Sequence, residues 1–182
     1  MGPVTLLPVR HDGWTIDDLD NLPDDGLRYE LVDGTLLVSP PPTVGHNSAA
    51  FELGVLLKSA LGDSWRVVPA PGVVVDRRNY REPDLVVLRR VALTASRASA
   101  QDVLLAVEVM SPSSITNDRL VKPALYARAG IPHYWRLERE TEPVLITHAL
   151  DGDAYRETAR FLDDVVIGEP ARLRFRLAEL FA

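Results

Sequence analysis

Two carboxylates stand in or beside apolar stretches, where a charged side chain is costly unless it has a partner. Residues 102–109 form an apolar run that predicts a strand buried on both faces, and Glu108 lies inside it. Ser111-Pro112-Ser113 ends this strand, so Glu108 is placed near the carboxyl end, where open α/β sheets bind ligands. Asp84 belongs to a second short strand, Pro83–Leu88, whose proline suits a first strand position. We therefore take Glu108 and Asp84 as the leading candidates for an active site.

Lys122 is a candidate of a different kind. The chain has only two lysines, and arginine supplies the other positive charges. A lysine, unlike an arginine, can lose its proton when its surroundings shift its pKa. The sequence predicts a helix over residues 117–129, on which Asp118, Lys122 and Tyr126 share one face at a spacing of four. Pro123 leaves a second option, in which the helix begins near Lys122.

These side chains have the chemistry of a metal-dependent hydrolase. Asp84 and Glu108 supply hard oxygen ligands for Mg²⁺ or Mn²⁺, and the carbonyl of Val109 is available as a further ligand. A bound ion lowers the pKa of water and offsets charge on a phosphodiester. Lys122 could orient or deprotonate the attacking water, or neutralise the developing charge. The alternative is a purely structural ion pair between Glu108 and Lys122.

Composition restricts the class of protein. A chain of 182 residues with 46% apolar and 25% charged residues fits one globular α/β domain over residues 1–182. No cysteine is present, which excludes disulfides and thiolate metal sites. Without a membrane-length apolar segment or a secretory leader, we expect a cytoplasmic protein. The net charge of −6 argues against nonspecific coating of nucleic acid. Five arginines near the Asp84 strand form either a local basic patch or scattered solvated charges: Arg77, Arg78, Arg81, Arg89 and Arg90.

The elements that must position these residues follow from hydrophobic periodicity and turn signals. Asp33-Gly34 predicts a hairpin between strands at 27–32 and 35–38. Glu30 lies midway along the first strand and faces either solvent or the site. The longest helix, over residues 45–61, carries His46 near its start, as a site residue or as a surface or capping residue.

Further strands are predicted in both halves of the chain. We expect residues 120, 121, 124 and 125 to form the core-facing stripe of the helix over 117–129. Strands outnumber helices, so the expected fold class is mixed α/β. The predicted strands cover residues 65–69, 72–76, 133–138, 143–150, 154–160, 165–167 and about 172–177.

Taken together, these motifs resemble the bacterial putative restriction-endonuclease family, a former domain of unknown function within the PD-(D/E)XK nuclease superfamily. The resemblance spans roughly residues 14 to 181. Its matching segments are Arg28-Tyr29-Glu30-Leu31-Val32-Asp33-Gly34, the helix opened by His46, Pro83-Asp84, Glu108-Val109-Met110-Ser111-Pro112-Ser113, Asp118-Arg119-x-x-Lys122 and Leu125-Tyr126-Ala127-Arg128-Ala129-Gly130-Ile131-Pro132-x-Tyr134-Trp135.

The resemblance implies a restriction-endonuclease-like core, α/β (α+β), in which helices flank a mixed central sheet. It also implies a homodimer with a Mg²⁺- or Mn²⁺-dependent phosphodiesterase site that acts on nucleic acid, expected to be DNA. Asp84 and Glu108 would bind the metal, Lys122 would serve as the catalytic lysine and Glu30 would be an additional acid. His46 and Tyr126 would support the site or the substrate.

One position departs from the superfamily pattern. The superfamily places lysine two residues after the acid, and that position here is Met110. Lys122 on the following helix must therefore reach the acids instead. A rival hypothesis is a module that retains the nuclease fold but binds nucleic acid or protein without cutting.

Overall fold

A computed structural model describes residues 10–112, 114–139 and 142–181, so Ser113 of the strand-ending motif lies outside the described residues. The α-helices are α1 (Ile16–Leu19), α2 (Val44–Ala60) and α3 (Lys122–Arg128). A π-helical segment, η3 (Asn117–Val121), leads into α3. Three short 3-10 segments complete the helical elements, η1 (Arg90–Thr94), η2 (Ala100–Asp102) and η4 (Leu177–Phe181).

The strands form a central sheet, a smaller sheet and a hairpin. The central sheet has the order β11-β10-β9-β8-β6-β3, and only its β8–β9 pair is parallel among the described residues. The smaller sheet has the order β2-β1-β5-β4-β7. The bounds are β1 (Arg28–Val32), β2 (Thr35–Ser39), β3 (Trp65–Pro69), β4 (Val73–Asp76), β5 (Asn79–Arg81), β6 (Leu85–Arg89), β7 (Ala98–Ser99), β8 (Val103–Val109), β9 (His133–Arg139), β10 (Pro143–Asp151), β11 (Ala154–Phe161), β12 (Asp164–Ile167) and β13 (Leu173–Arg176).

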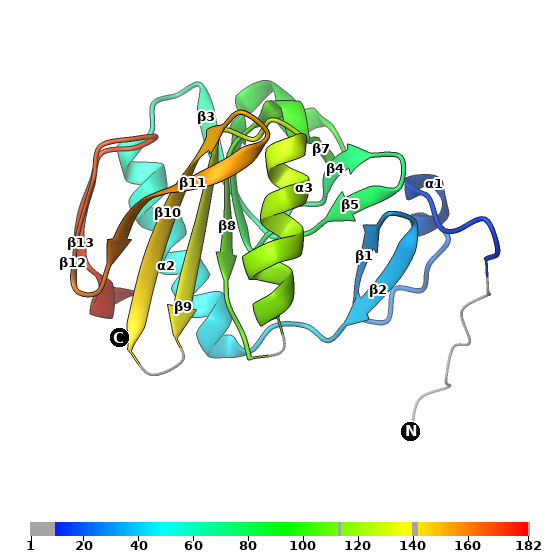
Figure 1. Cartoon of the computed structure of the whole chain (residues 1–182), viewed down its shortest axis with the longest axis horizontal. Coiled ribbons are helices and arrows are strands. Elements are labelled where there is room, and N and C mark those ends of the chain that lie inside the picture. The colour runs from blue at the N-terminus through cyan, green and yellow to red at the C-terminus, as the bar shows by residue number, and fades with distance from the viewer. Residues whose placement is uncertain (1–9, 113, 140–141, 182) are drawn as a thin grey trace.

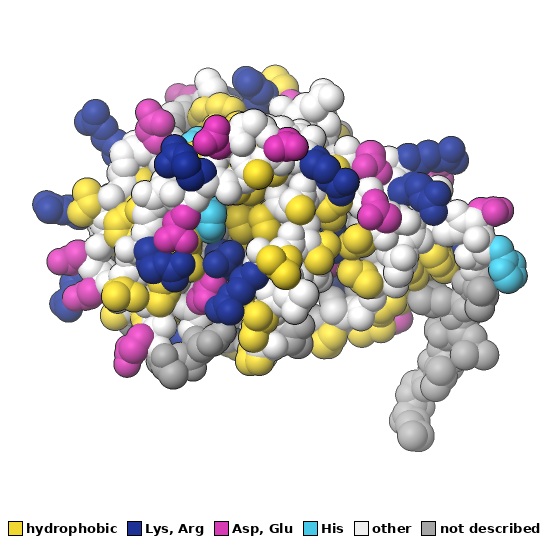
Figure 2. Space-filling model, viewed as in Figure 1, with side chains coloured by type: hydrophobic (Ala, Val, Ile, Leu, Met, Phe, Trp, Pro, Cys, Tyr) yellow, Lys and Arg dark blue, Asp and Glu magenta, His cyan; other side chains and the backbone are white. Residues whose placement is uncertain are grey.

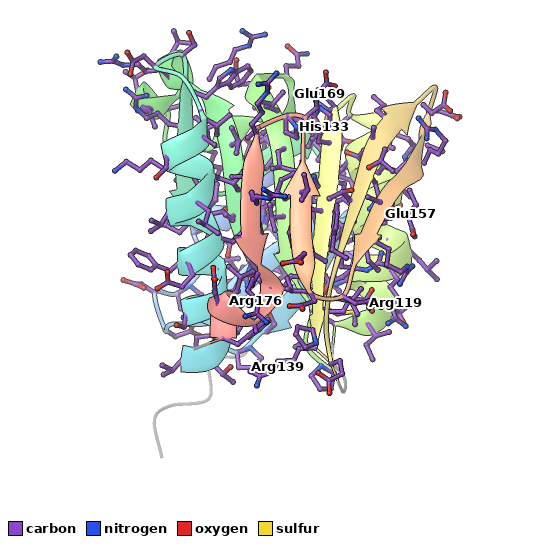
Figure 3. The ribbon with its side chains drawn as sticks, turned by 90° about the vertical axis from the view of Figure 1, so that its left-hand side faces the viewer. Arg119, His133, Arg139, Glu157, Glu169 and Arg176 are labelled. Atoms are coloured by element: carbon purple, nitrogen blue, oxygen red, sulfur yellow. The ribbon has the colours of Figure 1, made fainter. Side chains whose placement is uncertain are left out.

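Different elements cover the two faces of the central sheet (Figure 1). Helix α3 covers one face, whereas α2 and the β12–β13 hairpin lie side by side on the other (Figure 3). Strand residues alternate between the faces. Val107 and Val109 therefore pack with α2, whereas Ala106 packs on the α3 side. The same alternation turns Glu108 toward α3, so the sheet presents this carboxylate to the helix that carries Lys122.

The smaller sheet lies beside the central sheet and carries the N-terminal hairpin (Figure 1). Asp33 and Gly34 both adopt a positive φ, of 47° and 79°. A two-residue turn of this kind matches the twist of the two strands, so the predicted hairpin is confirmed. Trp14, Leu31 and Tyr80 form the separate small core of this region.

The helix predicted over residues 117–129 differs from expectation in two ways. Residues 117–121 are π-helical and α3 begins at Lys122. Pro123 has no N–H to donate. The carbonyl of Asp118, five residues earlier, accepts from the hydroxyl of Tyr134 instead. The core-facing stripe was also wrong in part, because Leu120 is 66% exposed and Ala124 is exposed. The face with Lys122 and Tyr126 is buried instead, because Glu108 supplies polar partners inside the core.

The arginine-rich turn before Asp84 contains a strand that the sequence did not predict. This strand, β5, pairs with β1 and β4. Otherwise the predicted strands agree with the structure to within about two residues, and the mixed α/β fold with a central mixed sheet flanked by helices is confirmed. None of the helices in the described residues is long and apolar enough to cross a membrane.

Candidate active site

Glu108 is the centre of a buried polar cluster beneath α3. Its side chain is fully buried. One carboxylate oxygen, Oε2, lies 2.6 Å from the Nζ of Lys122, and the other, Oε1, accepts a hydrogen bond of 3.0 Å from the hydroxyl of Tyr126. Both partners come from α3, at the spacing of four residues that the sequence predicted. The helix therefore satisfies a carboxylate that the sheet alone would leave unpaired.

Lys122 joins Glu108 to a third carboxylate. Its Nζ also lies 2.9 Å from Oδ1 of Asp118, one turn earlier. Asp118 is buried, and its backbone carbonyl accepts a 2.6 Å hydrogen bond from the hydroxyl of Tyr134. This contact to the sheet holds the π-helical segment in place, so the lysine is fixed from both sides.

Asp84 lies at the start of β6, next to the end of β8. Its Oδ2 accepts a 2.8 Å hydrogen bond from the backbone N–H of Val109, the residue after Glu108. Its Oδ1 lies 3.0 Å from Nε2 of His46 at the start of α2, and 3.3 Å from Nη1 of Arg28 in β1. Four elements thus converge on this carboxylate, and His46 lies at the site rather than on the free surface.

Glu30 is buried in β1 rather than facing solvent. Its Oε1 accepts a 2.8 Å hydrogen bond from the backbone N–H of Glu82 and lies 3.4 Å from Nε of Arg81. These contacts fix the backbone that leads into Asp84. The geometry gives Glu30 a part in positioning the site, and its role as an additional acid remains a prediction.

The two candidate metal-binding carboxylates have opposite pKa shifts. Complete burial, together with Asp84 and Asp118, raises the pKa of Glu108 to about 8, although Lys122 opposes the shift. Burial also opposes ionisation of Asp84, but His46, Lys122 and the Val109 N–H outweigh it and lower the pKa of Asp84. In the same way, burial disfavours the charged form of Lys122, but the surrounding carboxylates outweigh it and raise the pKa of Lys122. Lys122 therefore stays protonated at neutral pH.

The donor chemistry of the cluster fits a divalent ion. A carboxylate offers about four lone-pair directions. Glu108 accepts two hydrogen bonds and Asp84 has three polar partners, so each carboxylate keeps a lone pair that no protein donor occupies. In the described residues no three His, Asp or Glu side chains already converge as a ligand set, so backbone oxygen and water would have to complete the coordination. Val109 contacts Asp84 through its backbone N–H, whereas the sequence predicted its carbonyl as the metal ligand.

A cavity of about 550 Å³ opens beside Asp84. Residues of β1, α2 and the end of β3 line it, and Asp84 forms part of its wall. The direct contact between Lys122 and Glu108 is the feature expected of a structural ion pair. A cavity that reaches a buried carboxylate is a feature of a ligand site.

Sequence reasoning missed two residues of this cluster. Arg28 holds Asp84 from a strand 56 residues away, and it also donates to the side chain and the carbonyl of Glu82. Asp118 was placed on the correct helix face but was not included among the candidate site residues. Arg28 lies two residues before the candidate acid Glu30 in the sequence. This short spacing was the one sequence feature that could have identified Arg28 as a site residue.

The predicted arginine patch does not form as one surface. Arg81 is fully buried and donates a 3.0 Å hydrogen bond to Oδ1 of Asn117. Arg77, by contrast, has a 74% exposed side chain. On the face shown in Figure 2, Lys and Arg side chains alternate with Asp and Glu side chains. Scattered charges describe these arginines better than a basic patch.

Comparisons with known proteins place the chain among nuclease-like proteins. The family model described as Uma2, putative restriction endonuclease, matches residues 16–178. A crystal structure of a putative nuclease belonging to DUF820 from Anabaena variabilis is similar to this chain, with a TM-score of 0.72 and 17% sequence identity. The match covers 92% of this chain and 97% of that chain, which shows a shared fold. No curated protein matches the sequence.

Proposed function

Because the chain belongs to the Uma2 family of putative restriction endonucleases, we propose that it is a divalent-metal-dependent endonuclease that hydrolyses phosphodiester bonds in DNA. The observation that carries this proposal is the buried cluster of Asp84, Glu108 and Lys122, in which Asp84 accepts a hydrogen bond from the residue after Glu108 and also lines a cavity. A structural ion pair alone would need neither Asp84 nor the cavity.

Asp84 and Glu108 would hold Mg²⁺ or Mn²⁺, with the carbonyl of Val109 as a further ligand. When bound, such an ion supplies Lewis acidity and lowers the pKa of coordinated water. Because the pKa of Glu108 is raised to about 8, its proton must leave before the carboxylate can act as a ligand. The Lys122 ammonium and the Tyr126 hydroxyl hold Glu108 in place for that purpose.

Lys122 acts as a cation rather than as a base. Its pKa is raised, so its Nζ is protonated and cannot accept a proton from water at neutral pH. A fixed ammonium group can orient the attacking water and neutralise charge on the phosphate. In hydrolysis the water oxygen forms a bond to phosphorus and releases one proton to solvent, while the bond to the leaving sugar oxygen breaks and that oxygen takes up one proton from solvent. His46 and Arg28 keep Asp84 oriented at the cavity wall.

The second candidate function is a module that binds nucleic acid or protein without cutting. The direct contact of Lys122 with Glu108 favours it, because that contact gives both buried side chains a polar partner without a metal. A plasmid cleavage assay separates the two functions.

The test is the cleavage of supercoiled plasmid with Mg²⁺ or Mn²⁺. We expect the wild-type protein to cut and Glu108→Gln to lose at least about a hundredfold in rate. Glu138→Gln is the matched control, since Glu138 is also a buried carboxylate with a cationic partner, Arg119, but lies outside the cluster. Calorimetric titration with Mn²⁺ should show binding to the wild type and to the control, and weakened binding to Glu108→Gln. Equal cutting by all three proteins would contradict the proposal.

A further inference from the structure

The cavity beside Asp84 has walls that the proposed metal chemistry does not need. Helix α2, the connector before it and the end of β3 supply mostly apolar lining. Its volume of about 550 Å³ falls within the range of roughly 300–1,000 Å³ that small-ligand pockets occupy. The lining residues that matter here are Pro42, Ala50, Phe51 and Pro69 on the apolar side and Asn47 on the polar side.

The candidate acids are recessed. Asp84 is 8% exposed and Glu108 is 0% exposed, so a phosphate must enter the cavity to approach them. A fully paired duplex is too wide and stiff to insert one phosphate into a recess of this size. A nucleotide that has left the base stack can swing into such a pocket, as enzymes that act on extruded nucleotides require.

Phe51 gives the cavity a surface suited to a nucleobase. The Phe51 side chain lines the cavity beside Pro42, Ala50 and Pro69 and is 65% exposed. Every nucleobase has a flat π-face, and stacking on aromatic side chains is a common way to bind unpaired bases. Asn47, one turn earlier on α2, is exposed and carries an amide that can both donate to and accept from a base edge.

We propose that this cavity binds an unpaired nucleobase of the substrate, stacked on Phe51, and so selects DNA with an unpaired or extruded nucleotide at the cleaved position. This inference rests on the proposed nuclease function and names its substrate class. Asp84, shared by the cavity and the metal-binding set, places the bound nucleotide's phosphate next to the acids.

The test uses oligonucleotides that contain one 2-aminopurine, a base whose fluorescence falls when it stacks. Binding is measured in EDTA, so that no cleavage takes place, with single-stranded DNA, a fully paired DNA hairpin and single-stranded RNA. We expect the wild type to prefer the single-stranded probe and to quench it, and Phe51→Ala to bind about tenfold more weakly. Phe51→Tyr keeps the ring and should restore the quenching, and the RNA arm shows whether the sugar matters.

Val55→Ala is the matched control, because Val55 is also exposed on α2 and does not line this cavity. It should bind within about twofold of the wild type. Truncation of an exposed ring should not change the urea midpoint, which verifies that Phe51→Ala folds.

Equal affinity for the paired hairpin, together with unchanged binding by Phe51→Ala, would overturn the cavity proposal. Plasmid cleavage that depends on Glu108 would then still uphold the nuclease function. Conversely, Phe51-dependent binding without cleavage of any substrate would support base binding and overturn hydrolysis.

Discussion

At the scale of single residues, the site separates two carboxylates by their surroundings. Glu108 lies in an apolar strand and its pKa is raised to about 8, whereas Asp84 has a polar shell of His46, Arg28 and the Val109 N–H, and its pKa is lowered. Such opposite shifts in neighbouring groups are typical of active sites. Asp84 therefore ionises at a lower pH than Glu108.

These shifts predict a pH dependence of stability. Between pH 4.5 and about 8, the folded state holds a proton on Glu108 that the unfolded state has released, so the free energy of unfolding falls as pH rises. Its slope reaches about 1.4 kcal/mol per pH unit at most. Glu108→Gln cannot ionise, so this variant avoids the free-energy cost of a buried carboxylate charge. We expect urea midpoints in EDTA to be higher for Glu108→Gln than for the wild type at pH 8, with the difference vanishing near pH 4.

Asp84→Asn provides the opposite control. The lowered pKa of Asp84 means that its ionised form stabilises the folded state above the unfolded pKa, and that this contribution is lost as pH falls through the folded pKa. Asp84→Asn should therefore lower the urea midpoint at pH 8. The same sign of change in the Glu108→Gln and Asp84→Asn variants would contradict the assignment of opposite pKa shifts.

At the scale of secondary-structure elements, the β1–β2 hairpin fixes part of the site. It carries Arg28 and Glu30, which hold Asp84 and the chain before it. Its turn depends on Gly34, whose φ is +79°, and a Cβ there would lie 2.6 Å from Nη2 of Arg78. A side chain at this position therefore meets both backbone strain and a crowded guanidinium.

Gly34→Ala should destabilise the protein by about 1–2 kcal/mol, chiefly through the left-handed backbone conformation. Gly26→Ala is the matched control, because Gly26 has a φ of +78° and a Cβ added there would meet no atom within 4 Å. Chemical denaturation of both variants separates backbone strain from crowding by Arg78. Stability equal to the wild type for Gly34→Ala would show that the turn does not need its glycine.

The π-helical segment before α3 helps to position the polar side chains around Glu108. Pro123 would interrupt a long α-helix, but here it falls in the first turn of α3, after the π-helical segment. The change of helix type keeps Asp118 within 2.9 Å of Lys122 and leaves Tyr126 one turn further on. Lys122 therefore lies at the junction between the π-helical segment and α3, inside a continuous helical run over residues 115–128.

At the scale of the whole molecule, the layers explain why the site is recessed. Glu108 lies between the central sheet and α3, and Asp84 contacts His46 of α2 and Arg28 of β1. The net charge of −6 gives no broad attraction to nucleic acid. Under the proposed function, substrate binding would therefore come from the metal and from local contacts in the cavity.

The resemblance to restriction endonucleases leads us to expect a homodimer. Val165 and Phe175 of the β12–β13 hairpin are buried in the chain's own core, whereas Val166 on the other face of this hairpin is 58% exposed. The edge strand β11 carries exposed Arg156, Glu157 and Arg160, which discourage edge-to-edge pairing. A twofold dimer presents two equivalent sites to the two strands of DNA.

Light scattering on the protein as it elutes from a size-exclusion column should therefore give twice the monomer mass. Plasmid cleavage should yield linear product together with nicked circles. Dilution below the dissociation constant of the dimer should shift the products toward nicked circles. A monomeric mass at all concentrations would contradict the dimer.

The sequence by itself determined the features that depend on nearby residues. The Asp33-Gly34 hairpin, the apolar strand around Glu108 and the shared helix face of Asp118, Lys122 and Tyr126 all follow from turn chemistry or from a repeat of two or about four residues. These local patterns were sufficient to bring Lys122 to Glu108, because the helix follows directly after the strand.

Only the tertiary structure decided which distant side chains meet. Arg28 and His46 reach Asp84 from separate elements, Glu30 is buried where alternation alone left its direction open, and the cavity forms between segments far apart in the chain. Local periodicity tells which face of an element is apolar, but it does not tell which other element covers that face. The physical reason is that long-range packing, rather than neighbouring residues, fixes burial, and burial in turn sets the charge of Glu108.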